Sequence, residues 1–221
     1  MEIKTIVQAR MSSIRFPGKV LAPFMGLPMV AHVLNRITKV LDAGNVIMAT
    51  SVEVTDDPLC LYANELGYQV FRGPLEDVFT RFRLCLNEFP CDWFFRVCAD
   101  SPLLNSKLMD EMVAQITTGV DLITNVQKRT FPHGHSLELL KTSTFLTIDP
   151  ACLSPEDREH PTNYYYSNTK NFNIINFENL DGEYSMQNYA LDTIDDVPRL
   201  ESLYPTMPYD FIPSFRMTDH P

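Results

Sequence analysis

The chain has 221 residues, of which 45% are hydrophobic, and it carries a formal net charge of -10 at pH 7. This length and hydrophobic content allow one substantial domain with a full core. An acidic protein lacks the basic surface that binds a phosphate backbone, so nucleic acid is not an expected partner. No apolar run approaches the ~18 residues that span a bilayer, and the 5 cysteines include no Cys-x-x-Cys pair. We therefore expect a soluble, reduced, cytoplasmic protein without a membrane segment.

The first half of the chain alternates short apolar runs with amphipathic segments. A strand is expected at residues 2–8, followed by a helix that begins near Pro28 and ends at Gly44. Further strands are expected at 45–50, 68–71, 93–98 and 121–124, with helices at 56–66, 74–89 and 107–118. This alternation predicts parallel strands with helices packed on both faces of the sheet.

The regularity weakens after residue 125. We expect a strand within 136–140, a helix at 154–167, strands at 172–177 and 189–192, and a last helix at 194–204. The pattern predicts a single domain over 1–204 with a small β-rich insertion at about 126–188. The tail at 205–221 contains Pro208, Pro213 and Pro221, and we expect it to be an extended arm or poorly ordered.

Polar side chains follow the expected strands where those strands end. Arg10, Arg15 and Lys19 lie in the loop after the first strand, and Asp100 and Asp192 each follow a later strand. In sheets of this kind ligands bind beyond the carboxyl ends of the strands. If the strands are neighbours, three cations and two carboxylates meet in one cleft, an arrangement that suits a polyphosphate with a divalent metal.

Each of these residues also has a purely structural interpretation. The loop lacks the glycine spacing of a P-loop or a dinucleotide-binding turn, so its donors would be side chains and the backbone N–H groups near Ser12. The alternative for the loop is a solvated surface turn. For Asp100 and Asp192 the alternative is a helix N-cap. As two hard oxygen ligands, the same residues would suit Mg²⁺.

Several segments, in order along the chain, resemble the SpsF-like branch of the cytidylyltransferases that make CMP-activated acidic sugars, relatives of the acylneuraminate and ulosonate cytidylyltransferases. They are Gln8-Ala9-Arg10-Met-Ser12-Ser-Ile-Arg15-Phe-Pro-Gly-Lys19, Arg72-Gly73-Pro-Leu-Glu-Asp77-Val-Phe-Thr-Arg81, Arg96-Val-Cys-Ala-Asp100-Ser-Pro-Leu, Arg158-Glu-His160, and Leu191-Asp192-Thr193 with the following Asp195.

The resemblance implies a three-layer αβα nucleotide-diphospho-sugar transferase fold, Rossmann-like and GT-A-type, with a mixed sheet. It also implies a homodimer that binds CTP and a sugar acid, holds Mg²⁺ between Asp100 and Asp192, and releases pyrophosphate. Arg10, Lys19, Asp100 and Asp192 would carry catalysis, and the segment 126–188 would hold the acceptor. The implied substrate-binding residues are Gln8, Ala9, Arg10, Ser12, Arg15, Lys19, Arg72, Gly73, Asp77, His133, His135, Glu138, Arg158 and His160.

One segment departs from this pattern. Where the branch carries Phe-Pro-Asp-Gly-x-Asp-Val-Glu, this chain has Phe131-Pro-His133-Gly-His135-Ser136-Leu-Glu138. Two acidic positions have become histidine and serine, which leaves the acceptor open. His133 and His135 could be a metal pair, or simply solvent-facing or hydrogen-bonded histidines.

Two other functions are compatible with the sequence. A glycosyltransferase of similar fold would use a nucleotide-sugar donor and would usually carry Asp-x-Asp, whereas this chain has the single carboxylate of Asp100 at that place. A binding protein that keeps the fold without catalysis is the second alternative. The identity of the sugar and of the general base is open, and the preference for cytosine follows from the resemblance alone.

Overall fold

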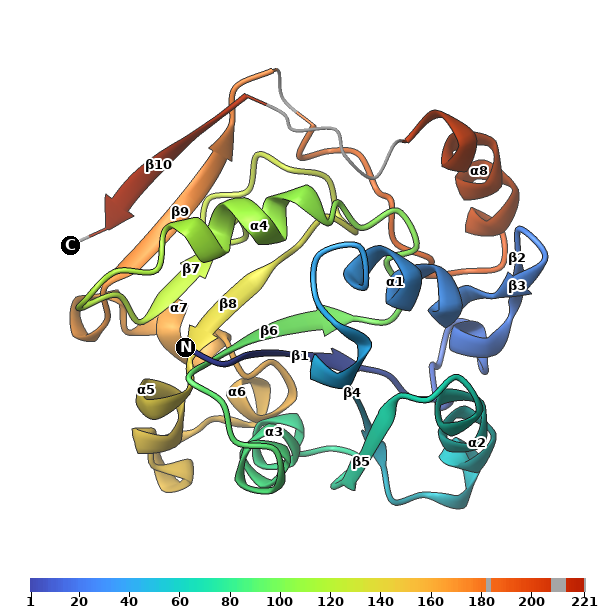
Figure 1. Cartoon of the computed structure of the whole chain (residues 1–221), viewed down its shortest axis with the longest axis horizontal. Coiled ribbons are helices and arrows are strands. Elements are labelled where there is room, and N and C mark those ends of the chain that lie inside the picture. The colour runs from blue at the N-terminus through green and yellow to red at the C-terminus, as the bar shows by residue number, and fades with distance from the viewer. Residues whose placement is uncertain (182–183, 208–213, 221) are drawn as a thin grey trace.

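The computed structural model describes residues 1–181, 184–207 and 214–220. Its main sheet has eight strands in the order β10-β9-β7-β8-β6-β1-β4-β5, and β2 and β3 form a separate two-stranded ribbon (Figure 1). The strands are β1 (Ile3–Gln8), β2 (Pro23–Phe24), β3 (Leu27–Pro28), β4 (Val46–Ser51), β5 (Gln69–Gly73), β6 (Trp93–Cys98), β7 (Leu122–Thr124), β8 (Glu138–Lys141), β9 (Ile174–Asn179) and β10 (Phe215–His220).

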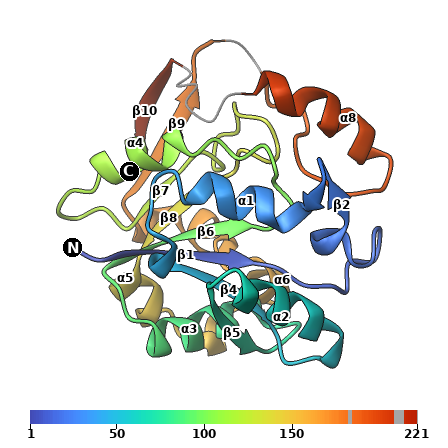
Figure 2. The ribbon, with the colours of Figure 1, turned by 45° about the vertical axis from the view of Figure 1, so that its right-hand side comes forward.

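Helices cover both faces of this sheet (Figures 1 and 2). They are α1 (Met29–Ile37), α2 (Asp57–Glu65), α3 (Val78–Glu88), α4 (Lys107–Ala114), α5 (Thr142–Thr147), α6 (Pro155–Glu159), α7 (Asn163–Ser167) and α8 (Asp196–Leu203). Successive strand residues point to opposite faces, so Val7 packs with α1 and α4 while Ile6 packs with α3 and α5. None of the helices within the described residues is long and apolar enough to cross a membrane.

The directions of the strands determine where a site can form. β1 pairs in parallel with β4 and β6, whereas β8 is antiparallel to both of its neighbours, β6 and β7. β7 therefore runs in the same direction as β1 and β6, and the carboxyl ends of these three strands lie along one edge of the sheet. The predicted three-layer α/β fold with a mixed sheet is confirmed.

Three expected elements differ in the structure. The helix expected at 154–167 is two short helices, α6 and α7, because Pro161 between them cannot donate the backbone hydrogen bond that would continue the first. The helix expected to end at Gly44 ends at Ile37. Residues 189–192 form no strand; instead Tyr189 N–H donates to the His133 carbonyl (2.7 Å), and Leu191 N–H donates to the Asp100 carbonyl (2.8 Å).

The segment 126–188 and the tail both contribute strands to the main sheet. β8 and β9 come from the segment expected as an insertion, and their neighbours are other strands of the central sheet. From the tail, β10 pairs antiparallel with β9 and forms one edge of the sheet. Pro208, Pro213 and Pro221, on which the expectation of an extended arm rested, lie outside the described residues.

Candidate functional site

The loop after β1 is held in a closed turn. Gly18 has φ 74°, a left-handed conformation that glycine adopts without a Cβ clash, and its N–H donates to the Met11 carbonyl at 2.8 Å. This hydrogen bond brings the two ends of the loop together and directs the chain into the short 3-10 helix Lys19–Leu21. Arg10, Arg15 and Lys19 are thereby presented at the carboxyl end of β1.

A buried carboxylate, Asp56, fixes the start of the same loop. Its side chain accepts hydrogen bonds from Met11 N–H (2.7 Å), from the Thr50 hydroxyl (2.8 Å), and from both the N–H and the hydroxyl of Ser51. Burial alone would raise the pKa of Asp56, but the hydrogen bonds from Ser51, Met11 and Thr50 outweigh it and lower the pKa. Asp56 was not among the predicted site residues, and only its position after the apolar strand hinted at this role.

Lys19 joins the two carboxylates that the sequence singled out. Its Nζ lies 2.8 Å from Asp100 Oδ2 and 3.4 Å from Asp192 Oδ1, and it also donates to the Leu191 carbonyl at 2.9 Å. Arg15 Nη2 donates to Asp192 Oδ1 at 2.9 Å. Asp100 and Asp192, which are 92 positions apart in the sequence, therefore both face the ammonium group of Lys19.

Neither carboxylate is a helix cap. α4 begins only at Lys107, so Asp100 lies well before its first turn. Asp192 does not cap α8 either. The turn before α8 is held by Asp196, whose carboxylate accepts hydrogen bonds from the backbone N–H groups of Asp192 (3.0 Å) and Thr193 (2.8 Å). The Thr193-x-x-Asp196 spacing is typical of a helix start and could have revealed this contact in the sequence.

The two carboxylates fit a small divalent cation. One ammonium nitrogen contacts both side chains, so a single ion in the same place would also reach both. The described residues contain no group of three or more histidine, cysteine, aspartate or glutamate side chains that could hold a metal. An ion with only two protein ligands would need oxygen from elsewhere, which is how Mg²⁺ binds together with substrate phosphates.

These side chains line a cavity of about 350 Å³ at the carboxyl edge of the sheet. From the predicted site it contains Gln8, Ala9, Arg10, Arg15, Lys19, Asp100, His160 and Asp192. Residues of the lining that were not predicted are Ser13, Ile14, Val20, Val78, Arg96, Cys98, Ala99 and Glu159. Arg10 lies 3.8 Å from the exposed Glu159, and the buried Gln8 Oε1 has no hydrogen-bond partner within the described residues.

A buried ion pair supports one wall of the cavity. Arg96 Nη1 donates to Glu138 Oε2 at 2.6 Å, and the other oxygen of Glu138 accepts from the Tyr166 hydroxyl at 2.6 Å. Glu138 is 2% exposed, so it reaches the cavity only through Arg96. Sequence analysis predicted Glu138 as a substrate-binding residue, and the structure places it behind the wall.

Other predicted substrate-binding residues have structural partners outside the cavity. Asp77 accepts from Thr80 N–H at the start of α3, and its other oxygen pairs with Arg158 at 2.6 Å. Arg72 pairs with Asp57 at 2.7 Å. A Cβ on Gly73 would lie 2.9 Å from the Arg81 side chain, so this glycine permits close packing. Ser12 is exposed on the loop, and a substrate contact by any of these residues stays a prediction.

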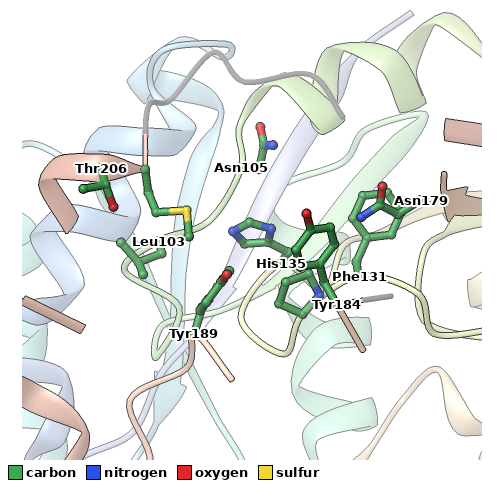
Figure 3. Close-up of a pocket in the computed structure, with 10 residues that line it drawn as sticks. Leu103, Asn105, Phe131, His135, Asn179, Tyr184, Tyr189 and Thr206 are labelled. Carbon is green, nitrogen blue, oxygen red and sulfur yellow. The ribbon is translucent and has the colours of Figure 1, made fainter. Parts of the chain in front are cut away.

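A second cavity, of about 260 Å³, contains His135 (Figure 3). Its lining is Leu103, Asn105, Phe131, Pro132, His135, Asn179, Tyr184, Tyr189, Thr206 and Met207. Burial, assisted by the positive charge of Arg36, lowers the pKa of His135 to about 4, so the ring is neutral near pH 7. His133 is exposed, and its charged neighbours are Arg129 and Asp192. The two histidines belong to no group of three or more candidate metal ligands within the described residues.

Comparison with known proteins assigns this arrangement to a family. The family model for cytidylyltransferase matches residues 5–205. The chain belongs to the cytidylyltransferase family. It is 28% identical over 211 residues to the spore coat polysaccharide biosynthesis protein SpsF of Bacillus subtilis, an alignment that covers 92% of this chain and 86% of SpsF.

Other relatives extend this result. The 3-deoxy-manno-octulosonate cytidylyltransferase of Geobacter metallireducens is 30% identical over 122 residues, which cover 55% of this chain and 47% of that protein. A cytidylyltransferase structure from Leptospira borgpetersenii superposes with a TM-score of 0.88 at 30% identity and covers 96% of this chain and 90% of the other. A CMP:2-keto-3-deoxy-manno-octonic acid synthetase complexed with CTP has a TM-score of 0.70 at 14% identity, covering 93% and 99%, and supports the fold.

Proposed function

We propose that this cytidylyltransferase activates an acidic sugar as its CMP derivative, from CTP, for the synthesis of a surface polysaccharide or glycoconjugate. The observation that carries the proposal is the placement of Lys19 between Asp100 and Asp192, in a cavity that Arg10 and Arg15 also line. Cationic side chains on one side suit a triphosphate, and paired carboxylates suit the metal that accompanies it. The relation to SpsF supports the polysaccharide context.

In the proposed reaction the acceptor hydroxyl oxygen attacks the α-phosphorus of CTP. A new phosphorus–oxygen bond forms, the bond to the β-phosphate breaks, pyrophosphate leaves with the electron pair, and the hydroxyl loses its proton. The charge that develops on pyrophosphate is met by Arg10, Arg15 and Lys19, whose loop is already held in place by Asp56 and Gly18. Positioning and charge stabilisation are then the main contributions of the protein.

Asp100 and Asp192 are the residues that would hold Mg²⁺. When bound, the ion would supply positive charge to the phosphate oxygens. Lys19 would have to leave the carboxylates to contact phosphate. Its ammonium group would therefore pair with Asp100 and Asp192 in the free protein and with the triphosphate in the complex. Mg²⁺, homodimer formation and a cytoplasmic location belong to this proposal.

The experiment is an incubation with CTP, Mg²⁺ and a panel of sugar acids that includes 3-deoxy-manno-octulosonate, with detection of pyrophosphate. We expect pyrophosphate release that depends on one of the acids and is lost in Asp100→Asn. The matched control is Asp110→Asn, which should retain activity, because Asp110 is an exposed aspartate on α4 whose one ion pair among the described residues is with Lys107.

The same incubation separates the alternatives. Turnover of a nucleotide-sugar donor without use of CTP would show a glycosyltransferase, and no turnover of either kind would show a binding protein. Calorimetric titration with each of the four nucleoside triphosphates then measures base preference, for which we expect CTP to bind most tightly.

A further inference from the structure

Arg129 is an unusual cation within the described part of the chain. Its Nη1 donates to the Ser136 hydroxyl at 3.0 Å, and it has no carboxylate partner. Every other arginine has a carboxylate or a backbone carbonyl as a partner. The remaining guanidinium N–H groups of Arg129 are not among the buried atoms that lack a partner, so they are open to solvent. Arg129 therefore keeps unused donors and a positive charge that no ion pair within the described residues compensates.

The nearby acid does not neutralise this charge. Glu138 is already bound by Arg96 at 2.6 Å and by the Tyr166 hydroxyl at 2.6 Å, and it is 2% exposed. Burial lowers the pKa of Arg129, and the nearby Glu138 and Tyr166 offset this effect only in part, although a guanidinium stays charged in proteins. An anion that paired with Arg129 would therefore offset part of the cost of burying its charge.

Arg129 and Ser136 are not part of the cavity lining, but their neighbours are. Both lie in the segment between β7 and β8, at the sheet edge where β1 and β6 also end. Arg129 interacts electrostatically with Glu138, whose carboxylate is bonded to Arg96 in the cavity wall. The exposed His133 of the same segment interacts electrostatically with both Arg129 and Asp192, and Asp192 lines the cavity.

Strand order separates two cationic groups. Along the sheet edge, the loop 10–19 follows β1, Asp100 follows β6, and Arg129 and Ser136 lie between β7 and β8, on the other side of β6. The backbone of His133, in the same segment, is hydrogen-bonded to the chain that leads to Asp192. In this order Asp100 thus lies between the cations of the loop 10–19 and the separate cation of Arg129.

We propose that Arg129, oriented by Ser136, binds the carboxylate of the acceptor sugar. This inference rests on the proposed function and names the part of its substrate that is recognised. The reacting hydroxyl would then lie between Arg129 and the α-phosphate. Ser136 is uncharged and accepts one hydrogen bond from Arg129. It therefore leaves the charge of the guanidinium available to an anionic substrate, whereas a carboxylate at this position would neutralise it.

The test compares Ser136→Asp, which places a carboxylate against Arg129, with Ser136→Asn, which is similar in size and uncharged. For the sugar acid that the parent uses best, we expect Ser136→Asp and Arg129→Gln to raise KM about tenfold or more, as expected for a lost charge-assisted contact. The kcat and the KM for CTP should change little, and Ser136→Asn, whose side-chain oxygen can accept from Arg129 in place of the hydroxyl, should raise the KM for the sugar acid much less than Ser136→Asp.

A second readout does not depend on turnover. Pyruvate, the smallest 2-keto carboxylate, is titrated by NMR into the protein with CDP present to occupy the phosphate-binding loop. We expect binding by the parent and by Ser136→Asn, and its loss in Ser136→Asp. Equal binding by parent and Ser136→Asp, or no binding by the parent, would overturn the inference. Pyruvate binding at Arg129 without turnover of any sugar acid would instead refute the proposed function and leave the anion site standing.

Discussion

Replacement of Lys19 by methionine should have two opposite effects, because its ammonium group occupies the place between Asp100 and Asp192. The side chain is 12% exposed and makes contacts at 2.8, 2.9 and 3.4 Å. Hydrogen bonds to charged groups contribute about 1.5–3 kcal/mol each, but water can reach the exposed parts of both carboxylates, so we expect a net loss of about 2 kcal/mol. For a protein of this size that corresponds to a fall in Tm of roughly 4–8 °C.

The same substitution should strengthen metal binding in the absence of nucleotide. In the parent a divalent cation must displace the ammonium group of Lys19 from both carboxylates. In Lys19→Met the cation can bind the two carboxylates without displacing an ammonium group. We expect the Kd for Mn²⁺, measured from the free-ion signal in electron paramagnetic resonance, to fall by about tenfold, or ~1.4 kcal/mol. Turnover of CTP should fall at the same time, because Lys19 no longer contacts phosphate.

A matched control is Lys107→Met, which removes an exposed ion pair with Asp110 at 3.6 Å. Such pairs contribute little, so neither Tm nor Mn²⁺ affinity should change measurably. If Lys19→Met bound Mn²⁺ no more tightly than the parent, the ammonium would not compete with the metal, and the assignment of this place to a cation would be wrong.

Three further predictions follow from contacts around the site. Asp100→Asn and Asp192→Asn should each depress the metal-dependent rate strongly with the double variant little worse, and additive losses in log rate would argue against a shared ion. Gly134→Ala should lower Tm and slow turnover, because residue 134 has φ 89° and the Cβ of alanine would lie 2.5 Å from the Tyr189 backbone. An unchanged Tm would contradict this close packing. The pKa of Asp56 in the folded protein is lowered below 3.8, so the stability that its ionised form contributes is complete above pH 3.8 and is lost as the pH falls through the folded-state pKa. The free energy of unfolding of Asp56→Asn should therefore depend less on pH in this acid range than that of the parent. Identical pH profiles of the two proteins would refute this prediction.

Local sequence patterns were sufficient to predict most of the sheet. Apolar runs such as 93–98 and the helical spacing that follows them report on burial, and burial is decided by residues close in sequence. The tail and residues 189–192 could not be predicted in this way. β10 forms because β9 offers it an unpaired edge, and 189–192 is fixed by hydrogen bonds to His133 and Asp100, so in both cases the conformation depends on a distant partner.

In the candidate site, too, some residues were predictable from local sequence and others depend on distant partners. Arg10, Arg15 and Lys19 were evident because three cations in one polar loop of an acidic chain are a local signal. The roles of Asp56, Arg96 and Arg129 depend on which side chains the fold brings against them, and the ion pair that ties Asp77 to Arg158 is equally invisible in the sequence. By itself the sequence determined which charges the chain carries and which strands they follow. Only the tertiary structure decided which charges are already neutralised and which are left for a ligand, because ion pairing depends on distances between residues that strand order, and not chain position, sets.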